Sequence, residues 1–267
     1  MSPRSTTVCG REAPSGDGYF ARSQQPLEIL FFLLPLIVLY ELGLLWVLRS
    51  GNSVLDNKAH DAIRRVFEAL GLDATAMSLP ALSLPGILLV IILLVWHVLT
   101  RRRWQVDLKT VATMFAESAC LALPLVVLAQ LIMQALSTPV PAVALPAASD
   151  SLHELPVIGR LAISIGAGLY EELIFRMVLI AVLHTLCVEV LRWSETVAIT
   201  VSIVISALAF AAYHPLHDPD GALNWARAAA YFAIGGYFGS VFAFRGFGIV
   251  VGTHAAYDIA VLLMPRG

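Results

Sequence analysis

Long apolar segments separated by short polar stretches dominate this chain. Each is close to the roughly 20 residues that an α-helix needs to cross the hydrocarbon core of a bilayer. The pattern predicts about seven spans, at residues 27–48, 83–99, 111–136, 161–186, 197–213, 225–244 and 247–264. The expected fold is therefore an all-α, polytopic transmembrane helical bundle.

The segment 52–72 has a different pattern. Its apolar residues recur at helical spacing and its charged residues fill the opposite side, which is typical of an amphipathic helix lying at the membrane surface. The apolar face comprises Leu55, Ala59, Ile63, Val66, Phe67 and Leu70, and the polar face Asp56, Lys58, Arg64, Arg65 and Glu68. A specific partner site and ordinary packing against the bundle both remain open for this helix.

Polarity divides the chain into three parts. Residues 1–25 are polar, carry Gly and Ser, and lack the apolar core of a signal peptide, so we expect a flexible N-terminal tail. Residues 26–154 hold the first spans and the amphipathic segment. Residues 155–264 form the expected C-terminal helical core, after a Pro/Ala-rich connector.

Composition supports a membrane protein and excludes some partners. The chain of 267 residues is 58% hydrophobic and 13% charged, with a mean hydropathy of +0.80. Its formal charge of -2 provides no field that would concentrate nucleic acid. Cys9, Cys120 and Cys187 are scattered and indicate neither a disulfide framework nor a tetrahedral metal site.

Basic residues give a predicted orientation. Arg101, Arg102, Arg103 and Lys109 crowd one short loop, whereas loop 214–224 contains only acidic residues and histidines among its ionisable groups. The positive-inside rule places the arginine loop and the N-terminus in the cytoplasm. We expect a multi-pass integral protein, in the cell (inner) membrane if the host is bacterial.

Ionisable residues inside the apolar segment 161–186 provide the main clue to function. Glu171, Glu172 and Arg176 lie there, although a charge at the centre of a membrane helix costs about 2.5–3.5 kcal/mol. Residues four apart share a helix face, so Glu172 can pair with Arg176, while Glu171 points about 100° away. Glu171 is therefore the stronger candidate for chemistry.

Two further helices carry polar groups at the same spacing. Phe210 and His214 lie near the end of one predicted span, and His254 and Asp258 lie within the last. A carboxylate beside imidazoles can deprotonate water, protonate a leaving amine and stabilise developing negative charge, as peptide hydrolysis requires. A lone histidine or Glu–Arg pair is often structural, but convergence from three helices favours a common polar site.

These three motifs, in this order, resemble the CAAX protease and bacteriocin-processing family of intramembrane proteases, which is related to the type II CAAX prenyl endopeptidase. The resemblance covers roughly residues 155–264 and implies an all-helical membrane endopeptidase. By similarity, Glu171 and His214 activate a water, His254 and Asp258 occupy oxyanion-stabilising positions, and Glu172, Arg176 and Phe210 support the site.

One position departs from the family pattern. Many members have Asn where this chain has Asp258, and an ionised Asp cannot donate a hydrogen bond to an oxyanion. Either Asp258 is protonated or it orients His254. Glu171, His214, His254 and Asp258 could also be interpreted as zinc ligands, but the resemblance favours a glutamate-activated water without a cofactor.

Other functions remain as alternatives. Intramembrane Glu, His and Asp residues also mark proton-relay or transport pathways, and a scaffold or immunity protein could keep the same fold. The hydrolase hypothesis predicts a membrane-associated peptide or protein substrate, with a prenylated C-terminal peptide as one candidate by analogy.

Overall fold

The structure is a computed structural model that describes residues 18–49, 80–135, 156–218 and 220–263. These residues form helices and no β-strand, which confirms the all-α prediction. The helices are α1 (Tyr19–Arg22), α2 (Pro26–Arg49), α4 (Pro80–Thr100), α5 (Leu108–Ala135), α7 (Val157–Glu172), η1 (Leu173–Ile180), α8 (Ala181–Thr185), η2 (Leu186–Val190), α9 (Glu195–Tyr213), α10 (Trp225–Arg245) and α11 (Phe247–Leu263). The predicted amphipathic helix at 52–72 lies outside the described residues.

Each of the seven predicted spans coincides with a helix or a continuous helical segment. Four segments of the described chain are long and apolar enough to cross a bilayer, at Pro26–Gly43, Leu108–Leu128, Val157–Val190 and Glu195–Tyr213, and two shorter apolar helices lie at Gly86–Thr100 and Phe247–Val261. A helical membrane bundle is therefore confirmed. That α10 also spans the membrane stays a prediction.

The distribution of side chains suits a lipid environment. Large apolar residues such as Ile91, Val98 and Leu208 are exposed, while Glu172 and Arg176 are completely buried. Water would favour the reverse arrangement, because an unpaired charge is costly to bury and exposed apolar patches are normally limited. The outer surface therefore resembles the lipid-facing surface of a membrane bundle.

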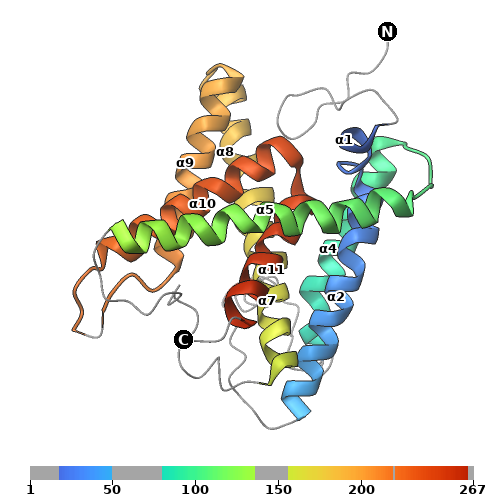
Figure 1. Ribbon diagram of the computed structural model, residues 1–267. Coiled ribbons are helices and arrows are strands. Elements are labelled where there is room, and N and C mark those ends of the chain that lie inside the picture. Colours follow the sequence, from blue (N-terminus) through green and yellow to red (C-terminus); the bar gives the residue numbers. More distant parts are fainter. Residues whose placement is uncertain (1–17, 50–79, 136–155, 219, 264–267) are drawn as a thin grey trace.

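Helix α11 lies at the centre of the bundle and packs against α7, α5, α10 and α2. Figure 1 shows α7 and α11 side by side, with α5 crossing α11. Glycines allow these close approaches: a Cβ at Gly168 would lie 2.9 Å from Val251 O of α11, and one at Gly252 would lie 2.5 Å from Ser118 Oγ of α5. By contrast, a Cβ at Gly236 would meet nothing within 4 Å.

The expected N-terminal tail ends earlier than predicted. Helix α1 lies within it, and Arg22 forms ion pairs with Glu28 and Asp107, each at 3.6 Å. The Thr110 hydroxyl donates to Asp107 Oδ2 at 2.9 Å, and this hydrogen bond lowers the pKa of Asp107. These contacts fix α1 beside the beginning of α5.

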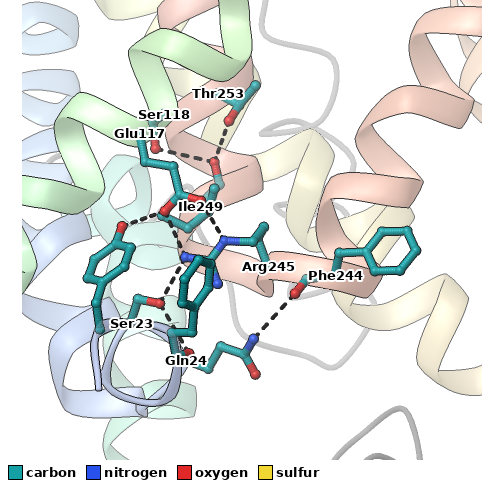
Figure 2. Close-up of polar contacts among 10 residues, drawn as sticks. Ser23, Gln24, Glu117, Ser118, Phe244, Arg245, Ile249 and Thr253 are labelled. Atoms are coloured by element: carbon teal, nitrogen blue, oxygen red, sulfur yellow. Dashed lines mark hydrogen bonds and ion pairs between the residues drawn. The ribbon is translucent and has the colours of Figure 1, made fainter. Parts of the chain in front are cut away.

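A second group of contacts, which we call the Glu117–Arg245 clamp, joins three helices (Figure 2). The Arg245 guanidinium forms two hydrogen bonds with the Glu117 carboxylate, one of them from Nη2 to Oε2 at 2.7 Å. The Tyr19 hydroxyl donates to the same carboxylate, and Arg245 also donates to Ser23 Oγ at 3.2 Å. The clamp connects α1 and α5 to the corner where α10 ends and Gly246, with φ of +86°, begins the turn to α11.

Candidate active site

The site forms where α7, α9, α10 and α11 meet, at a change of helix type. The long helix that carries Glu171 and Glu172 is α-helical to Glu172 and then becomes the π-helix η1. The wider turns of a π-helix change the pattern of backbone hydrogen bonds. Within η1, the carbonyl oxygen of Phe175 accepts a hydrogen bond from the Ser206 hydroxyl of α9 at 2.8 Å. π-Helical turns occur frequently at functional sites, and here the change comes directly after the two carboxylates.

Glu172 is the structural centre of the site. Its Oε2 lies 3.1 Å from Arg176 Nε, and its Oε1 lies 2.7 Å from His254 Nδ1. Because a carboxylate accepts, Nδ1 of His254 is the donor in this hydrogen bond. The predicted Glu172–Arg176 pair is therefore present, and it includes a bond to His254 that the sequence spacing did not reveal.

Arg176 contacts residues of α9 and α10. Its guanidinium carbon lies 4.5 Å from the centre of the Phe210 ring, and its Nη2 donates to Gly235 O at 3.1 Å. The Phe238 ring lies 5.5 Å away on α10. Phe210 is thus a packing and cation–π partner of Arg176, which gives a physical reason for a Phe four residues before His214.

Glu171 points away from Glu172 and faces His214. Glu171 Oε2 lies 3.7 Å from His214 Nε2, and both side chains are largely buried. The other ring nitrogen, His214 Nδ1, lies 2.7 Å from Phe210 O. Because a carbonyl can only accept, Nδ1 carries the proton, and in a neutral ring Nε2 then presents its lone pair toward Glu171.

His254 and Asp258 complete the group from α11. Asp258 Oδ2 lies 3.5 Å from His254 Nε2, and the Phe238 ring stacks on His254 with centroids 4.4 Å apart. His254 is held more closely by Glu172 than by Asp258, so the geometry assigns the orientation of this ring mainly to Glu172. Whether Asp258 is protonated stays a prediction. The structure thus brings together all the candidate residues predicted from sequence.

The chain after His214 is fixed by a compact polar network. Asp218 lies 3.0 Å from Arg227 Nη2 and accepts from Asn224 Nδ2, while Asn224 Oδ1 caps α10 by accepting from the backbone N–H of Arg227. An isolated bridge pairs His217 with Leu223. The acidic loop therefore forms an internally bonded turn that connects His214 to the beginning of α10.

The described residues do not fit a metal centre. Among them, no group of three or more His, Cys, Asp or Glu side chains is placed to hold an ion. We therefore derive no step through the zinc ion that the same residues had suggested as an alternative.

Sequence reasoning missed two features of this region. The Tyr231 ring stacks on His214, with centroids 4.2 Å apart and planes 26° from parallel. Glu117 of α5 is the ion-pair partner of Arg245 of α10. Neither contact has a sequence signal, because the partners are distant in the chain and belong to different helices.

Comparison with known families agrees with the motifs. Residues 153–260 match the family model described as type II CAAX prenyl endopeptidase Rce1-like, and this segment contains every candidate site residue. No curated protein and no solved structure matches the chain significantly. The match over residues 153–260 supports a CAAX-protease-like membrane endopeptidase.

Proposed function

We propose that this endopeptidase hydrolyses a peptide bond with a water activated jointly by Glu171 and His214. The observation that carries the proposal is the facing pair of acceptors, Glu171 Oε2 and His214 Nε2, 3.7 Å apart in a largely buried site. This separation is too long for a direct hydrogen bond. It is short enough for one water to donate one hydrogen to each atom, which leaves the water's lone pairs free for attack.

The reaction then follows from general acid–base catalysis. The water oxygen forms a bond to the carbonyl carbon, one proton passes to Glu171, and the carbonyl electrons move to its oxygen. The C–N bond breaks when Glu171 returns the proton to the leaving nitrogen. The products are a carboxylic acid and an amine, and the carboxylate of Glu171 is regenerated.

The remaining residues support this arrangement. Glu172 holds His254 Nδ1 at 2.7 Å and neutralises Arg176 within the same buried group. His254 and Asp258, 3.5 Å apart on α11, are the groups beside which a substrate carbonyl would be placed. The substrate class is a membrane-associated peptide or protein, and the family description suggests a prenylated C-terminal peptide as the first probe.

Replacing Glu171 by Gln tests the role of the base. The amide keeps the size of the side chain but cannot take a proton at neutral pH, so we expect turnover to fall by about 10²–10⁴. The measurement is cleavage of an internally quenched, farnesylated C-terminal peptide by purified protein in detergent or liposomes. Glu189→Gln is the matched control, because Glu189 is exposed and lies on the same helical segment.

Two outcomes would contradict the proposal. Normal cleavage by Glu171→Gln would exclude Glu171 as the base. Loss of activity with a tight chelator, restored only by added zinc, would require a metal-dependent mechanism instead. If the natural function depended on the protein but not on Glu171, a scaffold role would be favoured.

A further inference from the structure

Two tyrosines beside the site bury hydroxyl groups without a hydrogen-bond partner among the described residues. Tyr231 of α10 is 3% exposed and Tyr257 of α11 is 4% exposed, and neither hydroxyl bonds to a described residue. Leaving a buried donor unpaired costs about 1–3 kcal/mol. Folded proteins pair most such groups, so two of them at one site suggest a ligand that accepts.

The unpaired groups converge on the same space. The Tyr231 ring lies against His214, and its hydroxyl is within electrostatic range of Tyr257, Glu171 and Asp258. Glu171 Oε2 is likewise buried and forms no hydrogen bond within the described part of the chain. A proton acceptor and two unpaired hydroxyls therefore lie near the place assigned to the reaction.

Without these hydroxyls the site has no free neutral donor, because the Nδ1–H of His254 is used on Glu172 and that of His214 on Phe210 O. Glu171 as a carboxylate and the Nε2 lone pair of His214 are acceptors, and an ionised Asp258 is an acceptor only. An attack on a peptide carbonyl creates negative charge on oxygen, which must be met by preorganised donors. A phenol O–H, unlike an ionised carboxylate, can supply such a donor in a buried environment.

We propose that Tyr231 is a catalytic residue that donates a hydrogen bond to the substrate's carbonyl oxygen, with the Tyr257 hydroxyl beside it. This inference rests on the proposed peptide hydrolysis and adds a residue to it. When water attacks, the carbonyl oxygen gains the electron pair of the broken π bond, and Tyr231 strengthens its hydrogen bond to that oxygen. Tyr231 keeps its proton throughout, and Glu171 alone carries the proton from water to the leaving nitrogen.

The first test is Tyr231→Phe, which removes the hydroxyl and leaves the ring that packs on His214. Loss of one oxyanion donor should lower kcat about 10²–10³-fold, while KM for the farnesylated fluorogenic peptide changes little. Tyr237→Phe is the matched control on the same helix, because the Tyr237 hydroxyl donates to Leu121 O at 2.6 Å, toward α5 rather than the site. Its kcat should stay near that of the wild type.

Two further measurements separate donation from packing. Fluorinated tyrosines at position 231 are stronger donors, so kcat should rise as the hydroxyl becomes more acidic. Asp258→Asn in the Tyr231→Phe protein supplies an amide donor and should recover part of the lost kcat. A purely structural role for Tyr231 predicts neither response.

The outcomes distinguish this inference from the proposed function. Suppose that Glu171→Gln abolishes cleavage but Tyr231→Phe keeps kcat within about threefold of the wild type. Tyr231 is then not the donor, because losing an oxyanion donor lowers kcat about 10²–10³-fold. The hydrolytic function stands in that case. If Glu171→Gln cleaves normally, the proposed base is wrong. Binding of a peptide phosphonate, weakened by Tyr231→Phe and not by Tyr237→Phe, would still support Tyr231 in that case, and equal binding would overturn it.

Discussion

At the scale of single residues, Glu172 connects the chemistry to the framework. It is completely buried and contacts Arg176 on its own helix and His254 on α11. Buried ion pairs offer little net stability compared with apolar packing, but removing one partner leaves a buried charge. Glu172 therefore has two roles. Its hydrogen bond positions His254, and its charge compensates the buried guanidinium of Arg176.

Glu172→Gln should accordingly destabilise the protein by about 3–5 kcal/mol, because the Arg176 charge loses its partner. The amide can still accept from His254, so the principal effect is on stability and not on the direct contact to that ring. Thermal unfolding of the purified protein in detergent measures the change. Glu189→Gln, an exposed change of the same chemistry, should stay within about 0.5 kcal/mol of the wild type. Equal stability of the two variants would show that Arg176 is neutralised elsewhere.

The candidate site was predictable at this scale only in part. Four-residue spacing identified Glu172–Arg176, Phe210–His214 and His254–Asp258, because such pairs share a helix face. The bond between Glu172 and His254 joins residues 82 positions apart, and no periodicity reports on such a contact. The stacking of Tyr231 on His214 was missed for the same reason.

At the scale of elements, close contact between α7 and α11 sets the separation of Glu171 and Glu172 from His254. A Cβ at Gly168 would lie 2.9 Å from both Val251 O and Ala255 N. These are backbone atoms, so no side-chain rotation can relieve the contact. The two helices can approach this closely only because position 168 has no side chain.

Gly168→Ala should therefore push α7 away from α11, with a cost of about 1–3 kcal/mol as in other overpacked cores. It should also lower kcat, because a shift of α7 moves Glu171 relative to the groups on α9 and α11. Peptide cleavage and thermal unfolding of the same sample give both quantities. Gly236→Ala is the matched control, since a Cβ there meets nothing within 4 Å and alanine favours the helix by about 1 kcal/mol. A Gly168→Ala protein as stable and active as the control would contradict this account.

Helix positions were predicted well and helix type was not. The lengths of the apolar segments predicted helices at 225–244 and 247–264, within a few residues of α10 and α11. This works because a membrane-spanning helix needs about 20 consecutive apolar residues, which can be seen in the sequence. The π-helix η1 has no such signal. It depends on contacts such as Ser206 with Phe175 O, which exist only after α9 has packed against it.

At the scale of the whole molecule, the Glu117–Arg245 clamp connects the N-terminal helices to the segment that matches the protease family. Glu117 lies outside residues 153–260 and Arg245 lies inside them. Arg245 is the last residue of α10, directly before the turn into α11, which carries His254. The clamp is thus placed to hold the corner on which the position of α11 depends.

A double-mutant cycle with Glu117→Gln and Arg245→Gln should give a coupling of about 2 kcal/mol, within the range for contacting residues. Each single change leaves a partly buried charge unpaired, so the double variant should be more stable than the sum of the singles predicts. Unfolding in mixed detergent micelles measures the four free energies. Lys109→Gln, at an exposed position near the beginning of α5, is a control that should change stability little. Strict additivity would mean that the two halves are held together by apolar packing alone.

The clamp also brings basic residues from distant segments to one end of the molecule. Arg101, Arg102 and Arg103 are exposed between α4 and α5, and Arg22 is paired with Asp107 beside them. Because Arg245 is joined to Ser23, which follows α1, and to Glu117 of α5, it lies at the same end. The positive-inside rule counts basic residues close to span ends, so this end should face the cytoplasm.

Cysteine labelling tests that orientation in intact cells. The native cysteines are first removed. Gln105→Cys then reports on the basic end, and His217→Cys reports on the loop after His214. Both positions are exposed, and neither change removes an arginine or lysine. An impermeant maleimide should label the His217→Cys protein in intact cells and the Gln105→Cys protein only after permeabilisation, because three of the predicted spans separate the two loops and place them on opposite sides. Retained peptide cleavage by each variant confirms that it is folded. The reverse labelling pattern would invert the topology, and labelling of both from outside would show that the number of spans between residues 105 and 217 is even.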